Sequence, residues 1–381
     1  MSKGFIMKIV FVTAGAYDKE DYSNLNLLGT EYQIFGLSKE LVKKGHEVYI
    51  FRRWFENKFE TINGVNLWSF RSRKSRNSLV TTFSKLLFSN KISKVLKSIE
   101  IDILIIIDPF TSYFTLKLPI TKVSVIHNEI PLELLPKNGN FLVKIKNKFL
   151  RSMQNKFYTR SDCIVALNEE IKGFLEKKGY PSQVIPNGID INDYVPYYSH
   201  EKFIIYGGRI VKPKRINDLI KAYSLLNDKL KMKYKLIIIG EGSQKHYLEK
   251  LVLNYGLGDK VKFIPWLASA DFINEISKSS VFVLPSLFET FGVTTIEAMA
   301  LGKPVIVSDT YGSIDIVTNG YDGFIFKKRK INQLKYYLDL LLENEKLRLK
   351  MGKNARKTVE ENYTFDKISN EYIRLFNYLL N

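Results

Sequence analysis

Short apolar runs recur along the chain and alternate with longer stretches in which apolar residues follow a helical spacing. In the first half of the chain such runs end at Thr13, Phe51, Ile107, His127 and Leu167. Apolar strands that alternate with helices are typical of parallel sheets that are covered on both faces. The pattern therefore predicts an α/β fold.

The alternation starts again after residue 202, with the strand-like runs FIIYGGR, KLIIIGEG, VKFIPW, VFVLP and PVIVS. Between the two series, residues 184–202 contain Pro186, Asn187-Gly188 and Pro196 and show no periodicity. Such turn-forming residues without an apolar period indicate a connection between domains. We interpret this segment as an inter-domain linker.

A chain of 381 residues is too long for one typical hydrophobic core, so two domains are expected. We place the first at residues 1–195 and the second at residues 196–364, each a doubly wound Rossmann-like domain. Residues 365–381 have the spacing of a capped amphipathic helix and are expected to pack back on the first domain. Ligands of such sheets bind outside the carboxyl ends of the strands, which predicts a site in a central cleft.

The net charge of the chain limits the kinds of molecule that it is expected to bind. The net charge is +19 and the pI is about 9.5, which favours an anionic partner such as nucleic acid, an acidic membrane surface or a phosphorylated substrate. No apolar run approaches the roughly 18 residues that span a bilayer. The single cysteine, Cys163, excludes an internal disulfide and suits a reducing interior.

The stretch PSLFETFGVTTIEAMALGKPV follows one of the predicted strands. The loop at the end of this strand contains Phe291-Gly292, and glycine allows a ligand to approach the backbone. A helix is expected to begin near Thr294. The unpaired N–H groups at Val293 and Thr294 would then favour an anion.

Two glutamates flank this loop, and each has an alternative explanation. Glu289 is either a ligand-binding residue at the strand end or an exposed loop carboxylate. Glu297 is either a ligand-binding residue or the acidic member of a capping box with Thr294, which needs no ligand. Spacing alone leaves both questions open.

A cationic loop, YGGRIVKPKR, follows another predicted strand. Gly207-Gly208 followed by Arg209 and Lys214 would suit a diphosphate, and the alternative is a basic loop that only adds to the net charge. The neighbouring IIIGEGSQ is an incomplete dinucleotide fingerprint, because Lys245 stands in place of its third glycine. A tight turn is the better explanation of that stretch.

His127 ends a predicted strand, so it is a candidate site residue or an ordinary structural histidine. No pair of histidines has the spacing of a zinc site, and no Asp-x-Asp motif is present. The sequence therefore predicts no metal site.

Residues 282–309, FVLPSLFETFGVTTIEAMALGKPVIVSD, contain two glutamates with seven residues between them, the E-x7-E signature. The stretches GGRIVKPK, IIIGEGS, VKFIPWL, VIPNGID and KKGHEV accompany it. Together they resemble the retaining glycosyltransferases of family 4 (group 1), which have the GT-B fold. The resemblance covers essentially the whole chain.

The resemblance implies a nucleotide-diphospho-sugar donor, bound by the second domain without a metal or another cofactor. Glu297 would bind the ribose hydroxyls, and Glu289 would contact the donor sugar. Positions implied to hold the sugar, the diphosphate and the base are Gly208, Arg209, Lys214, Ile264, Trp266, Phe291, Gly292, Val293 and Thr294.

The first domain would then bind the acceptor, and His127 would lie beside the anomeric centre.

Three stretches depart from the family pattern. The first loop has Gly29-Thr30 where Gly-Gly is common, Lys214-Arg215 replaces Lys-Gly, and YGSID replaces Gly-Gly-x-x-Glu. These departures leave the sugar and acceptor pockets undefined.

Two parts of the first domain lack acidic residues, 71–97 and 137–160. In the second, apolar residues recur at about one helical turn, at Phe141, Ile145, Phe149, Met153 and Phe157. This predicts a basic amphipathic helix that lies either on an anionic membrane or against the core with a solvated basic face. We favour a lipid-linked or membrane-proximal glycan acceptor and a cytoplasmic protein held peripherally at the inner face of the cell membrane.

The resulting prediction is a hexosyltransferase of cell-surface polysaccharide, glycolipid or glycoprotein glycan synthesis. A nucleotide-sugar epimerase or hydrolase on the same fold is the alternative. A nucleic-acid-binding module is disfavoured, because the basic runs carry no recognised motif and no aromatic stacking array.

Overall fold

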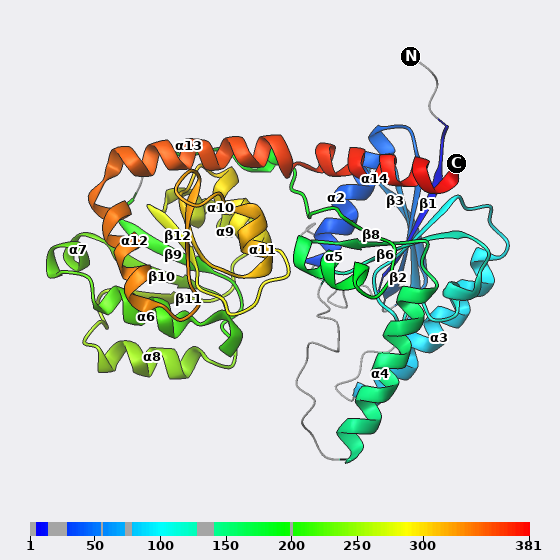
Figure 1. Ribbon diagram of the computed structural model, residues 1–381, viewed down its shortest axis with the longest axis horizontal. Coiled ribbons are helices and arrows are strands. Elements are labelled where there is room, and N and C mark those ends of the chain that lie inside the picture. Colours follow the sequence, from blue (N-terminus) through cyan, green and yellow to red (C-terminus); the bar gives the residue numbers. More distant parts are fainter. Residues whose placement is uncertain (1–4, 14–28, 55, 73–77, 128–140, 199–200) are drawn as a thin grey trace. The chain divides into compact units, whose positions relative to one another are not determined.

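The structure is a computed structural model that describes residues 5–13, 29–54, 56–72, 78–127, 141–198 and 201–381 (Figure 1). The chain divides into two compact units. Unit 1 comprises residues 1–186 and 368–381, and unit 2 comprises residues 187–367. Each unit is built on one sheet with helices on both faces, which confirms the predicted α/β class.

Unit 1 contains an eight-stranded sheet in the order β3-β4-β2-β1-β5-β6-β7-β8. All neighbouring strands are parallel except β3, which is antiparallel to β4 at the edge. The strands are β1 (Lys8–Thr13), β2 (Glu47–Trp54), β3 (Lys58–Ile62), β4 (Val65–Arg71), β5 (Ile103–Ile106), β6 (Thr121–Val125), β7 (Cys163–Ala166) and β8 (Ser182–Val184).

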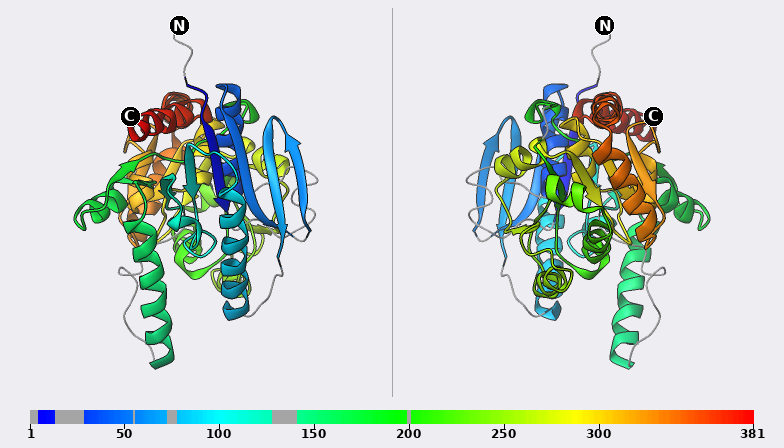
Figure 2. Two further views of the ribbon diagram at one scale, coloured as in Figure 1. Left: turned by 90° about the vertical axis from the view of Figure 1, so that its right-hand side faces the viewer. Right: turned by 90° about the vertical axis from the view of Figure 1, so that its left-hand side faces the viewer.

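Two buried clusters hold helices on opposite faces of this sheet (Figure 2). In the described part of unit 1, the helices are α2 (Thr30–Lys43), α3 (Ser78–Leu96), η1 (Thr115–Lys117), α4 (Phe141–Thr159), α5 (Glu169–Glu176) and most of α14 (Phe365–Leu380). Residues of α2 and α14 share one cluster, and residues of α3, α4 and α5 share the other. Alternate side chains of a strand point to opposite faces, so each central strand contributes to both clusters.

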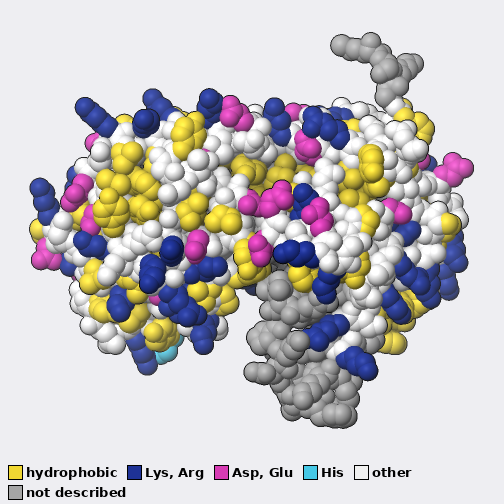
Figure 3. Space-filling view, viewed as in Figure 1, with side chains coloured by type: hydrophobic (Ala, Val, Ile, Leu, Met, Phe, Trp, Pro, Cys, Tyr) yellow, Lys and Arg dark blue, Asp and Glu magenta, His cyan; other side chains and the backbone are white. Residues whose placement is uncertain are grey.

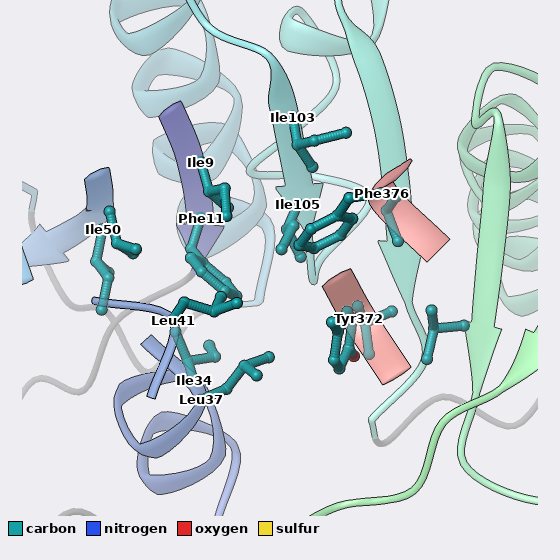
Figure 4. Packing of buried hydrophobic residues seen from close by; sticks show 14 of the residues in the cluster. Ile9, Phe11, Ile34, Leu37, Leu41, Ile50, Ile103, Ile105, Tyr372 and Phe376 are labelled. Carbon is teal, nitrogen blue, oxygen red and sulfur yellow. The ribbon is translucent and has the colours of Figure 1, made fainter. Parts of the chain in front are cut away.

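The C-terminal helix α14 is part of the core of unit 1. Tyr372 and Phe376 are 4% and 0% exposed, and they pack among Ile9, Phe11 and Ile105 of the central strands (Figure 4). The chain therefore returns to its first unit after completing the second.

Unit 2 contains a fully parallel six-stranded sheet in the order β11-β10-β9-β12-β13-β14. Its strands are β9 (Phe203–Gly207), β10 (Lys235–Ile239), β11 (Val261–Ile264), β12 (Val281–Leu284), β13 (Val305–Ser308) and β14 (Gly323–Phe326). Its helices are η3 (Ile191–Asp193), η4 (Lys212–Lys214), α6 (Ile216–Ser224), α7 (Asp228–Lys233), α8 (Lys245–Asn254), α9 (Ser269–Lys278), α10 (Val293–Ala300), α11 (Tyr311–Ile316), α12 (Ile331–Glu343) and α13 (Glu345–Asn362).

The segment expected to be a linker is instead partly folded into unit 2. Ile189 forms a β-bridge with Thr364, and Tyr194 is only 2% exposed. The absence of periodicity was misleading here, because these residues are fixed by contacts with distant segments rather than by a regular element.

No helix in the part of the chain that the structure describes is long and apolar enough to cross a membrane.

Candidate active site

The candidate donor residues lie at one edge of unit 2. Because its sheet is fully parallel, the loops after β9, β10, β11, β12 and β13 all leave from the carboxyl ends of the strands. This is the edge at which open α/β sheets bind ligands. The geometry of these loops decides which of the predicted residues meet.

Lys214 and Glu289 form an ion pair at this edge. Lys214 ends η4, and its Nζ donates to Oε1 of Glu289 in the loop after β12. The Ser286 hydroxyl donates to the same carboxylate oxygen at 2.6 Å. The Leu287 amide also donates to the Pro213 carbonyl oxygen at 2.8 Å, so the two loops are joined through their backbones.

Glu289 is 9% exposed, which rules out the alternative of an exposed loop carboxylate. A buried carboxylate requires partners, and Glu289 has both a cation and a hydroxyl.

Arg209 and Gly208 lie in the loop after β9, beside this ion pair. The Arg209 side chain is exposed, and its backbone carbonyl accepts a hydrogen bond from the Tyr206 hydroxyl at 2.9 Å. Burial raises the pKa of Tyr206; the negative charge of Glu289 raises it further, and the positive charge of Arg209 opposes both. The charges of Arg209 and Glu289 therefore act on the same hydroxyl.

The glycines of the GEG stretch are explained by close packing against this loop. A Cβ on Gly240 would lie 2.0 Å from the Gly208 carbonyl oxygen, and a Cβ on Gly242 would lie 2.2 Å from the Ile210 carbonyl oxygen. Backbone hydrogen bonds join the same segments, from Gly208 N to Ile239 O and from Ile210 N to Glu241 O. A structural turn, rather than a dinucleotide site, was the better explanation.

Gly292 is the N-cap of α10 and has a φ of +99°, a left-handed conformation that favours glycine. No side chain caps this end of the helix. The first N–H groups of a helix have no partner within the helix, so the backbone N–H groups of Val293 and Thr294 can donate to an anion.

The helix starts at Val293, one residue before the predicted start, and this excludes the capping box. A capping box needs its threonine at the N-cap and its glutamate three residues later. Here Gly292 is the N-cap, so Thr294 is the second helical residue and Glu297 is the fifth. Capping does not explain Glu297.

The carboxylate of Glu297 instead accepts a hydrogen bond from the Tyr194 hydroxyl, at 3.0 Å. Burial raises the pKa of Glu297 to about 7, and the bond from Tyr194 partly opposes this shift. Arg356 of α13 donates to the backbone carbonyl oxygens of Tyr194 and, at 2.7 Å, Ala300. Arg356 therefore ties the segment that carries Tyr194 to the end of α10.

Tyr194 and Arg356 are residues that the sequence reasoning missed. Tyr194 lies 103 residues before Glu297 in the sequence, and Arg356 lies 162 residues after Tyr194. No motif or periodicity connects these positions, and only the fold brings them together.

Phe291 is buried, and its backbone is in close contact with α11. A Cβ on Gly312 would lie 2.5 Å from the Phe291 Cα, and the Gly312 amide donates to the Glu289 carbonyl oxygen at 3.2 Å. The YGSID stretch departs from the family pattern but keeps a glycine where the loop approaches α11 most closely.

We expect Gly312→Ala to lower the free energy of unfolding by about 1 to 3 kcal/mol, because the new methyl group must displace the loop backbone. The matched control is Gly173→Ala in α5, where a Cβ meets nothing within 4 Å. That variant should be stabilised by about 0.5 to 1 kcal/mol, because alanine is the better helix former. Denaturant unfolding of the two variants checks the prediction, and equal effects would contradict it.

Arg215 explains the second departure from the family pattern. It has a φ of +52°, a left-handed conformation that favours the glycine of the Lys-Gly pattern. Its guanidinium forms two hydrogen bonds with the buried carboxylate of Asp218, at 2.8 and 2.6 Å. This bidentate pair offsets part of the backbone strain.

The residues predicted to contact the base lie at the end of β11. Ile264 is half-buried, and Trp266 is 40% exposed. The Trp266 ring stacks on Phe272, with ring centres 6.0 Å apart and an interplanar angle of 17°. Phe272 also occupies the space beside Gly207, where a Cβ would lie 2.5 Å from its ring. Trp266 therefore presents part of an aromatic surface next to the glycine loop.

The other predicted residues belong to unit 1. His127 is half-buried just beyond β6, and burial lowers its pKa to about 4, so the imidazole is neutral near pH 7. Gly29 is the N-cap of α2 with a φ of +61°, and Thr30 is the first residue of that helix. The Thr13 hydroxyl at the end of β1 donates to Glu31 in the same turn, at 2.8 Å.

The predicted basic helix exists as α4. Met153 and Phe157 are 4% and 1% exposed, so this part of its apolar stripe packs against the core. The side chains of Phe141, Ile145 and Phe149 lie outside the described residues. In the described part, the core-facing alternative holds.

Among the described residues, no group of three His, Cys, Asp or Glu side chains is placed to hold a metal ion.

Comparison with known proteins gives the family. The family description "Glycosyltransferase Family 4" matches residues 28–193, and "Glycosyl transferases group 1" matches residues 194–358. An uncharacterized glycosyltransferase of Methanocaldococcus jannaschii is 27% identical, over 90% of this chain and 92% of its own. The N,N'-diacetylbacillosaminyl-diphospho-undecaprenol alpha-1,3-N-acetylgalactosaminyltransferase of Campylobacter jejuni is 26% identical, over 62% of this chain and 68% of its own.

Solved structures agree in fold. Sucrose-phosphate synthase from Thermosynechococcus elongatus superposes with a TM-score of 0.80 at 18% identity, over 98% of this chain and 99% of its own. Anabaena HepE, solved in complex with UDP, gives a TM-score of 0.74 at 16% identity, over 98% of this chain and 100% of its own. The fold is GT-B, as predicted from the sequence.

The chain belongs to the group 1, family 4 glycosyltransferases.

Proposed function

We propose that this glycosyltransferase moves a hexose-type sugar from a nucleotide-diphospho-sugar to a glycan or lipid-linked acceptor, with retention of the anomeric configuration and without a metal. The observation that carries the proposal is the ion pair between Lys214 and the buried Glu289, at the strand edge that also bears Arg209 and the start of α10. The arrangement provides a cation for a phosphate and a carboxylate for sugar hydroxyls.

In the proposed donor complex, Lys214 and Arg209 bind the diphosphate, and the N–H groups at Val293 and Thr294 add to the positive field. Glu289 accepts hydrogen bonds from the sugar, and Glu297 accepts them from the ribose. The nucleotide base lies against Trp266. Each of these groups stands at the carboxyl edge of the unit 2 sheet.

The proposed reaction is a front-face substitution. The bond between the anomeric carbon and the diphosphate oxygen breaks, and the acceptor oxygen bonds to the same face of that carbon. The acceptor's proton passes to the leaving phosphate. The cations stabilise the charge that develops on the diphosphate, and His127 is proposed to lie beside the anomeric centre as a neutral imidazole.

Support for the acceptor class comes from composition and from the relatives. The Campylobacter jejuni relative is named for a diphospho-undecaprenol acceptor. The net charge of +19 and the acid-free run 71–97 favour an anionic surface. We therefore propose that the enzyme acts at the inner face of the cell membrane, in the synthesis of cell-surface polysaccharide, glycolipid or glycoprotein glycan.

The proposal predicts that one nucleotide-sugar, from a panel that varies base and sugar, raises the thermal unfolding temperature and raises it further as its concentration increases. Chelation with EDTA should leave this shift and the turnover unchanged, and NMR should find the product with the anomeric configuration of the donor. No protection by any member of the panel would contradict the donor assignment. An isomerised donor in the absence of acceptor would instead favour the epimerase alternative.

A further inference from the structure

We propose that the solvent-exposed face of α3 is the surface through which this protein binds an anionic lipid bilayer. The proposal deepens the proposed function, on which it rests for the membrane-bound acceptor. It assigns the contact to α3, whereas the sequence reasoning emphasised α4.

The first half of the exposed face is apolar. Val80, Phe83 and Leu87 are 48%, 64% and 56% exposed. They are three and four residues apart, so they form one stripe along the helix. Exposed side chains of this size are common singly, but a continuous stripe indicates an interaction surface.

The opposite face of α3 already holds the helix in place. Phe88, Ile92 and Leu96 are 4%, 0% and 1% exposed and belong to a core cluster of unit 1. The exposed stripe therefore has no part in packing the helix onto its sheet. The usual reason for an apolar helix face, which is contact with the core, does not apply to this stripe.

The second half of the same face is basic. The line of Phe83 and Leu87 continues to Lys91 and Lys94, which are exposed, and Lys97 follows directly. Lys91 contacts only neutral groups among its described contacts, the Phe70 ring at 5.1 Å and the Asn57 side chain at 3.4 Å. No acidic residue occurs from 71 to 97. Figure 3 shows hydrophobic and basic side chains next to each other over α3.

This arrangement suits a bilayer better than a second copy of the chain. A bilayer takes apolar side chains at the acyl boundary and lysines at anionic headgroups at the same time. In an antiparallel pair of α3 helices, the apolar half of one copy would face the lysines of the other. The net charge of +19 adds repulsion between copies.

The test is co-sedimentation of the full chain with vesicles of phosphatidylcholine mixed with phosphatidylglycerol, compared with phosphatidylcholine alone. We expect Phe83→Gln/Leu87→Gln to weaken binding to the anionic vesicles by about tenfold or more. Lys91→Gln/Lys94→Gln should reduce the preference for anionic vesicles by about tenfold. Glutamine is a good helix former, so both variants should keep the helix.

The matched control is Leu253→Gln in α8 of unit 2, where the leucine is 69% exposed. It should bind vesicles as the unaltered chain does. Equal binding by all three variants would overturn the proposal. A loss of self-association in the α3 variants, measured by analytical ultracentrifugation without lipid, would also overturn it in favour of a second copy.

Nucleotide-sugar protection against heat is measured on the same samples and does not depend on lipid. If no donor protects the chain while the α3 variants lose vesicle binding, the proposed function fails and the docking surface stands. If a donor protects the chain and the variants bind vesicles normally, the docking surface fails alone.

Discussion

Lys214→Ala is expected to lower kcat/KM for sugar transfer by at least about tenfold, and up to about a hundredfold, because a positioned cation at a leaving diphosphate acts mainly on the transition state. The side chain is fixed by its ion pair with Glu289, so it is already in place when the donor binds. Arg209→Ala should cause a loss of at least about tenfold. Steady-state rates with the donor identified by thermal protection provide the measurement.

The matched control is Lys212→Ala. Lys212 lies in η4 with Lys214 and is exposed, so the variant removes the same charge from the same short helix. Its rate should stay within about twofold of the unaltered enzyme, because an exposed charge is well screened. Near-normal rates in both Lys214→Ala and Arg209→Ala would contradict the diphosphate assignment.

Glu297→Gln is expected to weaken donor binding by about tenfold or more at pH 8, because the variant replaces the carboxylate that we propose as the acceptor of the ribose hydroxyls with a neutral amide. The same change should not destabilise the fold. Its effect on stability depends on pH, since the pKa of Glu297 in the folded chain is about 7, above its usual value near 4.5.

The sign follows from linkage. The folded chain favours protonated Glu297, so its contribution to the free energy of unfolding is complete below pH 4.5 and is lost as pH rises to about 7. The loss is about 1 to 3 kcal/mol. Glu297→Gln lacks this loss, so it should match the unaltered chain at pH 4 and exceed it in stability at pH 8. Lower stability at both values, with unchanged donor affinity, would assign Glu297 a structural role.

Tyr194→Phe separates positioning from charge. Loss of its hydroxyl removes a bond that favours ionised Glu297, so the pKa should rise further. Donor affinity should then fall at pH 7 and recover at higher pH, whereas Glu297→Gln should not recover. Calorimetric titration of the donor across this pH range distinguishes the two variants.

The sequence was sufficient for the parts of the fold that depend on local pattern. Apolar runs located β1, β2, β5, β6 and β7 of unit 1 and β9 to β13 of unit 2, whereas β8 and β14 were not predicted. The positions that follow the located strands include Arg209, Glu289 and Gly292 at one edge of unit 2. The hairpin of β3 and β4 was missed although Asn63-Gly64, with φ values of 51° and 78°, is a strong hairpin signal.

Other features had no local signal. The capping-box prediction depended on the helix start, and a difference of one residue moved Glu297 out of the first turn. Tyr194 reaches Glu297 across 103 residues of chain from a segment without periodicity. Propensity and spacing describe neighbours in sequence, so they cannot report such a contact.

The close packing between the loops after β9 and β10 has a consequence for engineering. Gly240 and Gly242 leave no room for a side chain against Gly208 and Ile210, and backbone hydrogen bonds join the two segments on both sides. If the loop that corresponds to YGGRIVKPKR were grafted from a relative, it would therefore pack against a loop after β10 that does not match it. Transplanting donor specificity in this scaffold requires moving both loops together, as a single cassette.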